Sequence, residues 1–272
     1  MNPLSPAAGA FNAIASQFDA RFSDWHSVAA QRRAVRRALW AALPTGARVL
    51  ELGGGTGEDA AWMAKHGFEV LLTDAAPAMV NEARSKLAFE GVRAEVAAAE
   101  ELPCFARDHL MQGGLPFDAA FSNFAPLNCV EDLTPVARGL AALIRPGGAA
   151  VLVLFGCFSP GEMLVETLCG RPRQALRRFA SEPKPARLGG QNFTVTYHRS
   201  QTLKAAMTPW FCLKRRVGIG IFVPPSAAEP WISRHPRFLR MLEQLDRVVE
   251  RPLARIGDHI LYHFERTGAP AP

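Results

Sequence analysis

Residues 49–59, Val-Leu-Glu-Leu-Gly-Gly-Gly-Thr-Gly-Glu-Asp, decide the fold class of this 272-residue chain. Arg48 to Leu52 is a short apolar run with an acid near its end, which predicts a buried strand. Glycines then cluster, and the residues from Asp59 onward have the apolar spacing of a helix. A strand, a glycine turn and a helix in this order bring bare backbone close to a ligand, because glycine has no Cβ and adopts positive φ readily.

The spacing of these glycines discriminates between ligands. A dinucleotide fingerprint has glycines at n, n+2 and n+5, with the pyrophosphate at the helix N-terminus. Here Gly53, Gly55 and Gly57 stand at n, n+2 and n+4, and Glu58 occupies n+5. Glu58 and Asp59 would repel a pyrophosphate but not a sulfonium cation. The Lys-Ser/Thr pair of a phosphate-binding P-loop is also absent from this turn.

The pattern Glu-x-Gly-x-Gly-x-Gly at residues 51–57 resembles motif I of the class I methyltransferases that depend on S-adenosylmethionine (SAM). Glu69 to Asp74 then predicts a second strand with an acid at its carboxyl end, 17 residues beyond Gly57. A ribose-binding acid has a similar separation in nucleotide-binding βαβ units, and a carboxylate there fits the adenosine half of SAM. Two structural alternatives stay open: the glycines could serve only as a turn, and Asp74 could cap the next helix.

Two later turns extend the resemblance. Val92 to Ala97 predicts a third strand, and residues 98–103 resemble the family's Asp-Ala-Glu-x-Leu-Pro turn, with alanine replacing the Asp that faces adenine. Phe117 to Asn123 predicts a fourth strand, and the Phe-Ala-Pro-Leu-Asn turn at 124–128 resembles motif IV, which faces the reacting methyl group. It differs from the Asn/Asp-Pro-Pro-aromatic turn of amino-methylating nucleic-acid enzymes. Asn123 could position a substrate heteroatom or satisfy its own turn.

The alternation of strands and helices predicts the architecture. A Pro-Gly-Gly at 146–148 resembles the family's entry into a fifth strand, here Ala149 to Phe155, and the chain ends in a strand from Asp258 to Arg266. We expect an α/β fold, a Rossmann-like doubly wound sheet of about seven strands, mostly parallel with an antiparallel last strand. Ligands bind beyond the carboxyl ends of such strands, so the four predicted turns converge on one crevice.

Four segments are predicted along the chain: an N-terminal helical cap (1–45), a SAM-binding core (46–155), a helical insertion after strand 5 (156–195) and a C-terminal part that completes the sheet (196–272). Residues 1–9 are expected to be disordered, and Phe11 to Leu43 helical. The Phe-x3-Ala-x2-Phe-Asp at residues 11–19 resembles the opening helix of the ubiquinone/menaquinone-type methyltransferases. That resemblance implies a segment packed over the cofactor and substrate opening.

The insertion is predicted to hold a helix over 160–180 and a loop over 183–192. In related enzymes such an insertion caps the active site and determines the substrate. Its arginines could bind a carboxylate or phosphate of an anionic substrate, although a solvated position is favoured; they are Arg171, Arg173, Arg177, Arg178 and Arg187. A solvated helix face is likewise favoured over an anion site for Arg32, Arg33, Arg36 and Arg37.

Composition limits the classes of partner. No run of 18 apolar residues occurs and the first residues lack the layout of a signal peptide, so we expect a cytoplasmic protein without a membrane partner. Five cysteines without a CxxC predict free thiols and no metal site. The net charge is +6, but the basic residues are scattered over several segments, so nucleic acid is not the expected partner. The oligomeric state stays open.

The resemblance implies a set of cofactor contacts: Glu51, Gly53, Gly54, Gly55, Gly57, Asp74, Ala75, Met79, Ala99, Glu100, Asn123 and Phe124. No motif identifies a general base, and the candidates are His198, Tyr197, Asn128 and His26. Asp258 and His259 look like an acid–base pair. They are interpreted as structural, because adjacent residues of a strand point to opposite faces.

The resemblance therefore implies transfer of the SAM methyl group to an oxygen, nitrogen or carbon atom of a small molecule, leaving S-adenosylhomocysteine. One alternative is a SAM-binding regulatory protein without catalysis. Another is methylation of RNA or protein, which only the basic charge balance supports.

Overall fold

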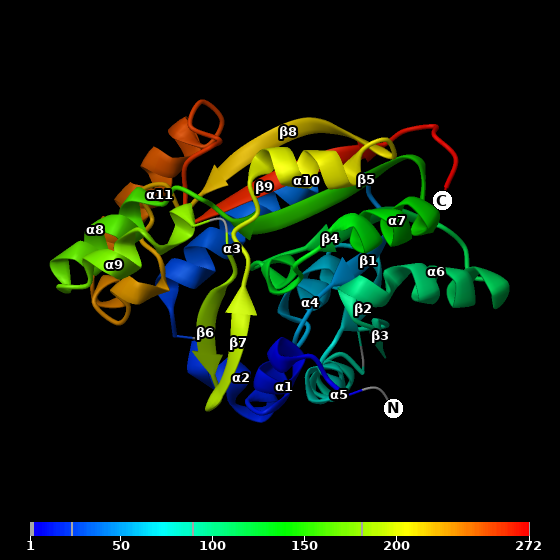
Figure 1. The fold of residues 1–272 in the computed structure, drawn as a ribbon, viewed down its shortest axis with the longest axis horizontal. Helices are drawn as coiled ribbons and strands as arrows, with labels where there is room; N and C mark the ends of the chain where they lie inside the picture. The colour runs from blue at the N-terminus through cyan, green and yellow to red at the C-terminus, as the bar shows by residue number, and fades with distance from the viewer. Residues whose placement is uncertain (1–2, 23, 89, 181, 272) are drawn as a thin grey trace.

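The computed structural model describes residues 3–22, 24–88, 90–180 and 182–271, and a seven-stranded sheet forms its centre (Figure 1). The strands lie in the order β3-β2-β1-β4-β5-β9-β8. Their bounds are β1 Arg48–Leu52, β2 Glu69–Asp74, β3 Arg93–Val96, β4 Phe117–Ser122, β5 Ile144–Phe155, β8 Phe211–Ile219 and β9 His259–Arg266. Neighbours from β3 to β5 are parallel, and β9 is antiparallel to both β5 and β8. The predicted Rossmann-like sheet is confirmed.

Helices cover both faces of this sheet, as a doubly wound fold requires. One face packs against α6 (Leu102–Met111), α7 (Thr134–Leu143) and α10 (Ser200–Met207), and the other against α3 (His26–Trp40), α4 (Glu58–Lys65) and α5 (Pro77–Lys86). Side chains of a strand alternate between the faces. Accordingly Leu50 and Leu52 of β1 belong to the first core and Val49 to the second. This burial on both faces explains the nearly continuous apolar runs of the inner strands.

The chain reverses its direction of travel across the sheet at β1. From β1 it proceeds through β2 to β3 on one side, and it then returns to β4 and β5 on the other side. Such a switch point leaves a crevice beyond the carboxyl ends of the two central strands. The glycine turn after β1 and the turn after β4 therefore lie at the position where an open α/β sheet binds its ligands.

The N-terminal part forms α1 (Pro6–Asn12), α2 (Ala15–Phe22) and then α3. The expected disorder of residues 1–9 is wrong for residues 6–9, which belong to α1, while residues 1–2 lie outside the described chain. The helix starts early because Pro6 suits the first helical position and the Ser5 side chain accepts a hydrogen bond from the Ala8 N–H at 3.2 Å.

The insertion differs from the expectation in two ways. The helix predicted over 160–180 is divided into α8 (Pro160–Leu168), α9 (Pro172–Ala175) and the 3-10 turn η3 (Arg177–Phe179). The loop predicted over 183–192 is wrong, because β6 (Lys184–Leu188) and β7 (Gln191–Val195) form a hairpin there. Gly189 and Gly190 connect its strands with φ of 57° and 79°, the backbone that tight hairpin turns favour.

This hairpin lies beside the N-terminal helices (Figure 1). The rings of Phe193 in β7 and Phe11 in α1 have centroids 6.0 Å apart. Ile14 and Met79 form a small core with the half-buried Phe11, Phe18, Phe22 and Leu188. The cap and the hairpin of the insertion are therefore packed together over the start of α5.

The remaining elements are α11 (Pro236–Val249) and four 3-10 turns, η1 (Ala99–Glu101), η2 (Pro126–Cys129), η4 (Ser226–Ala228) and η5 (Ile232–Arg234). Across the described ranges, no helix has both the length and the apolar character needed to cross a lipid bilayer.

Candidate active site

The glycine turn after β1 has glycine where both backbone and space require it. Gly53, Gly55 and Gly57 have φ of 64°, 56° and 83°, a region that other residues adopt only with strain. A Cβ on Gly53 would lie 2.3 Å from the Cβ of Pro126, so the turns after β1 and β4 touch there. A Cβ on Gly55 would meet nothing within 4 Å. The backbone of Gly55 is thus the part of the turn that faces open space.

Asp74 fixes this turn from the end of β2. Its Oδ2 accepts a hydrogen bond from the Gly55 N–H at 2.9 Å, and its Oδ1 accepts one from the Ala76 N–H at 2.8 Å. Burial raises the pKa of this carboxyl group, and the two backbone bonds oppose that rise. A carboxylate oxygen can accept more than one hydrogen bond, so both oxygens keep acceptor capacity.

Glu51 lies buried beneath the glycine turn and is 2% exposed. Burial raises the pKa of this carboxyl group well above its usual range, and the nearby Asp59 adds to the shift, against the opposing charges of Arg32 and Arg36. Within the described part of the chain, its Oε2 has no hydrogen-bond partner. Buried acceptors in native proteins nearly always have a donor, so this atom marks a position for a donor of a ligand.

Asp59, at the start of α4, accepts hydrogen bonds from three side chains. Its Oδ2 accepts from Arg32 Nη1 at 2.9 Å and from Asn123 Nδ2 at 2.7 Å, and its Oδ1 accepts from Arg36 Nε at 2.7 Å. The amide oxygen of Asn123 accepts from the Phe124 N–H at 2.8 Å. Arg32 and Arg36 are thus ion-paired rather than solvated, and both polar ends of Asn123 are occupied within its own surroundings.

The turn after β4 is strained. Phe124 and Ala125 have φ of 55° and 64° although neither is glycine, which costs on the order of 1–3 kcal/mol per residue. Surrounding contacts hold the turn in place: the guanidinium carbon of Arg32 lies 4.7 Å from the centre of the Phe124 ring, and the Ala125 N–H donates to the Val153 oxygen. Strain of this kind is concentrated at functional sites.

The N-terminal cap reaches the glycine turn directly. The Thr56 hydroxyl donates to Asp19 Oδ1 of α2 at 2.5 Å, and Lys86 Nζ of α5 lies 3.0 Å from Asp19 Oδ2. The segment that resembles the family's opening helix is therefore packed over the glycine turn.

The His259 ring lies beside Phe124, in the turn after β4. Its ring stacks on Phe155 at 4.9 Å between centroids and meets Phe124 edge-on at 5.6 Å. Its Nδ1 lies 3.4 Å from Asp258 Oδ2, although this contact does not satisfy the geometry of a hydrogen bond. The interpretation that Asp258 and His259 point to opposite faces is wrong, because β9 begins at His259 and the alternation of a strand does not extend to Asp258.

Asp258 belongs to a buried ionic cluster. Arg178 Nη2 donates to Asp258 Oδ1 at 2.5 Å and also bonds Glu162, while Gln31 Nε2 of α3 donates to Asp258 Oδ2 at 3.1 Å. Burial alone would raise the pKa of Asp258, but the neighbouring His259 and the charge of Arg178 hold it well below its usual range. Arg178 is buried, so it connects the insertion to the sheet and is not a solvated side chain.

Residues 49–148 match a protein family described as "Methyltransferase domain". This part of the chain is similar to methyltransferase domains. The chain's sequence is 31% identical over 112 residues to a tRNA 5-carboxymethoxyuridine methyltransferase of Escherichia coli (strain K12), which covers 41% of each chain. It is 36% identical over 111 residues to a ubiquinone biosynthesis O-methyltransferase of Xanthomonas axonopodis pv. citri (strain 306), covering 40% of this chain and 43% of the relative. The matches thus span less than half the length of these curated relatives.

Solved structures extend the similarity from this segment to the fold of most of the chain. A SAM-dependent methyltransferase from Mesorhizobium loti superposes with a TM-score of 0.53 at 21% identity, covering 87% of this chain and 98% of that one. A TehB-like SAM-dependent methyltransferase from Corynebacterium glutamicum gives a TM-score of 0.52 at 15% identity, covering 93% and 98%. The fold is that of the class I SAM-dependent methyltransferases, and the family implies SAM as the cofactor.

The surroundings of the glycine turn fit that cofactor. Open space adjoins the backbone of Gly55, a buried acceptor without a donor lies at Glu51, and Asp74 has acceptor capacity left. Cys129 lies in the turn after β4 and is half-buried. Burial, together with the charges of Glu100 and Asp74, raises the pKa of its thiol to about 12, so it stays protonated. Cys129 was not among the sequence-based candidates, because nothing in its neighbours in the chain indicates these contacts.

The other predicted cofactor contacts differ in exposure. Met79 is buried, Ala75 and Ala99 are half-buried, and Glu100 is exposed.

The four candidates for a general base have other contacts. Asn128 is fully buried, and its amide donates to the Thr196 oxygen at 2.6 Å and accepts from the Phe155 N–H at 3.0 Å. His198 Nε2 lies 2.8 Å from the Val130 oxygen, and burial lowers the pKa of this ring. The Tyr197 ring is packed against Phe155 and Arg178. His26 is exposed at the start of α3, and its backbone N–H donates to Ser233.

Proposed function

We propose that this protein transfers the methyl group of SAM to a small-molecule acceptor and releases S-adenosylhomocysteine. The observation that carries the proposal is the arrangement of residues at the carboxyl ends of β1, β2 and β4. There the open backbone at Gly55 is flanked by two buried or half-buried carboxyl groups, Glu51 and Asp74, and faces a strained turn. An acidic, glycine-lined crevice at a switch point suits a ligand that has a ribose and positive charge.

Three residues would hold the cofactor. Asp74 has acceptor capacity for the two ribose hydroxyls, and the unpartnered Oε2 of Glu51 is suited to a donor on the amino-acid part. The backbone of Gly55 allows close approach without a side chain in the way. When bound, SAM supplies an already activated methyl group, so the protein's main task is alignment. Such positioning contributes roughly 7–11 kcal/mol to lowering a barrier.

The acceptor would lie on the side of Phe124, Phe155 and His259. We propose that His259 takes up the acceptor's proton, because it is the histidine whose ring lies against Phe124, in the turn that resembles motif IV. The Asp258 carboxylate, 3.4 Å from Nδ1, would stabilise the positive charge that the ring acquires on taking up the proton. A general base of this kind contributes about 10²–10⁴ in rate. The rings of Phe124 and Phe155 would exclude water from the acceptor.

RNA is the alternative acceptor, since one relative methylates tRNA. The contacts of three arginines of α3 favour a small molecule as the acceptor instead. Arg33, Arg36 and Arg37 border a surface hollow with two tryptophans, yet each is paired with a carboxylate, from Glu243, Asp59 and Glu250. Arginines neutralised in this way contribute little to phosphate binding. A SAM-binding protein without catalysis is the second alternative, and it requires that no acceptor enter beside His259.

The test is methyl transfer from labelled SAM by the purified chain, offered a panel of small hydroxyl, amine and carbon acids and, separately, total tRNA. We expect a methylated small molecule and no labelled tRNA. Titration calorimetry with SAM and S-adenosylhomocysteine provides the binding arm. Binding without any product in either panel would favour the regulator, labelled tRNA would favour the alternative acceptor, and the lack of SAM binding would overturn the proposal.

A further inference from the structure

A row of apolar side chains is exposed along α11. Phe238, Met241, Leu245 and Val248 are 42%, 47%, 43% and 75% exposed. Their spacing of three and four residues places them on one side of the helix. Trp231, itself exposed, extends the row beyond the helix start, since its ring lies 6.2 Å from that of Phe238. We call these five residues the α11 row. Large exposed apolar side chains that adjoin one another indicate an interaction surface.

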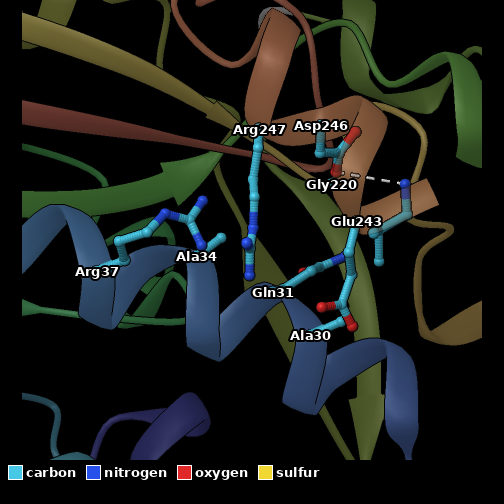
Figure 2. Close-up of a pocket in the computed structure, with 9 residues that line it drawn as sticks. Ala30, Gln31, Ala34, Arg37, Gly220, Glu243, Asp246 and Arg247 are labelled. Carbon is cyan, nitrogen blue, oxygen red and sulfur yellow. Dashed lines mark hydrogen bonds between the residues drawn. The ribbon is translucent and has the colours of Figure 1, made fainter. Parts of the chain in front are cut away.

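The opposite side of α11 packs against the rest of the protein. All the acidic side chains of region 231–256 have their partners there. Glu243 pairs with Arg33, Glu250 Oε2 lies 2.7 Å from Arg37 Nη2, and Asp246 accepts from the Phe222 N–H at 2.7 Å. Figure 2 shows Glu243 and Asp246 on the side of α11 that faces α3. No acid in 231–256 is therefore left for the outward face.

Arginines adjoin the α11 row. Arg237 and Arg240 are exposed on α11 itself, on the flank next to the row, and Arg234, Arg251 and Arg255 are exposed in the turns at its two ends. None of these five has an ion-pair partner in the described chain. The outward surface of 231–256 thus combines an uninterrupted apolar row with unneutralised positive charge.

We propose that this surface docks on an anionic phospholipid membrane, with the α11 row in the boundary between headgroups and acyl chains and the arginines on the lipid phosphates. A helix with one apolar side and a cationic flank lies in the plane of such an interface. The guanidinium group matches phosphate with paired hydrogen bonds. The sequence-based expectation of no membrane partner rested on the lack of a spanning segment, and surface docking needs none.

Other occupants fit this surface less well. A second copy of the chain packed row against row would bring the unpaired arginines of both copies together. Nucleic acid offers phosphates to the arginines but no apolar environment for Met241, Leu245 and Val248, and single strands are bound through aromatic planes instead. The charge and the aliphatic side chains are satisfied together by a lipid surface.

The test is co-sedimentation of the full chain with vesicles of phosphatidylcholine alone or mixed with phosphatidylglycerol. We expect binding to the mixed vesicles, little to phosphatidylcholine, and partial release by salt. The double substitution Met241→Gln/Leu245→Gln should weaken binding at least about tenfold. Arg237→Gln/Arg240→Gln should weaken it by about fivefold for each arginine removed. Val248→Gln provides a second change in the row should the first variant fold poorly, as judged by circular dichroism.

Matched controls lie on other helices. Met111→Gln removes an exposed apolar side chain at the end of α6, and Lys204→Gln removes an exposed charge on α10; both should bind vesicles like the parent. Failure of the parent to bind mixed vesicles, or equal binding by the row variants, would overturn the proposal. So would a dimer in light scattering that the row variants abolish, or binding to poly-uridylate that exceeds binding to vesicles. None of these readouts depends on methyl transfer, so the docking surface stands or falls independently of the proposed function.

Discussion

Substituting single glycines by alanine separates the backbone role of the glycine turn from its ligand role. Gly55 and Gly46 both have positive φ, 56° and 77°, and an added Cβ meets nothing within 4 Å at either position. Gly46 precedes β1 at the end of the strand that is remote from the crevice. Alanine in this backbone conformation costs roughly 1–2 kcal/mol. We therefore expect Gly55→Ala and Gly46→Ala to lower the free energy of unfolding by similar amounts, measured by urea titration.

The two variants should differ in ligand binding. The new methyl group of Gly55→Ala would occupy the open space that we assign to SAM, so calorimetry should show affinity reduced at least tenfold, or about 1.4 kcal/mol. Gly46→Ala should bind SAM like the parent. A Gly55→Ala protein with unchanged affinity would refute the assignment of this space to the cofactor. Equal loss in both variants would show that the effect is one of stability alone.

Three further outcomes are expected. Burial raises the pKa of Glu51 above its value in the unfolded chain, so the unfolding free energy should decline as pH rises from the unfolded pKa toward the raised one. Glu51→Gln should flatten this decline in urea titrations at several pH values. An unchanged slope would contradict the raised pKa. His259→Gln should lower kcat by about 10²–10⁴ with the KM for SAM unchanged and with partial rescue by imidazole, whereas a change in KM alone would point to a structural role. Arg178→Met should lower the unfolding free energy by about 3–5 kcal/mol, because it removes the buried cation that Glu162 and Asp258 share. A loss below about 1 kcal/mol would count against the buried cluster.

The core of the fold could be predicted because its signals are local. The apolar run of β1, the glycines after it and the acid at the end of β2 each depend on neighbours in the chain, and the structure places Asp74 on the Gly55 N–H. The hairpin at 184–195 also had a local signal, two adjacent glycines between two short runs, but richness in proline and arginine favoured a loop. The prediction failed because composition was given more weight than turn chemistry.

The acceptor side could not be predicted for a different reason. Arg178 is buried by Glu162 and Asp258, which lie 16 and 80 residues away in the chain. No spacing rule indicates a contact over 80 residues, so a solvated arginine was the natural expectation. The contact between Asp258 and His259 depends on where β9 begins, and boundaries of strands are the least predictable part of a sequence-based assignment.

The two consecutive left-handed residues at Phe124 and Ala125 have a consequence for variation in this protein. Their conformation is imposed by neighbours in the glycine turn, β5 and α3 and is not one that they prefer by themselves. Substitutions that only loosen those neighbours would let the turn relax, while most of the sheet stays intact. In a mutational scan, substitutions that leave the amount of folded protein unchanged but lower the turnover rate should therefore concentrate around this turn. The temperature at which such variants lose activity should lie below the temperature at which they unfold.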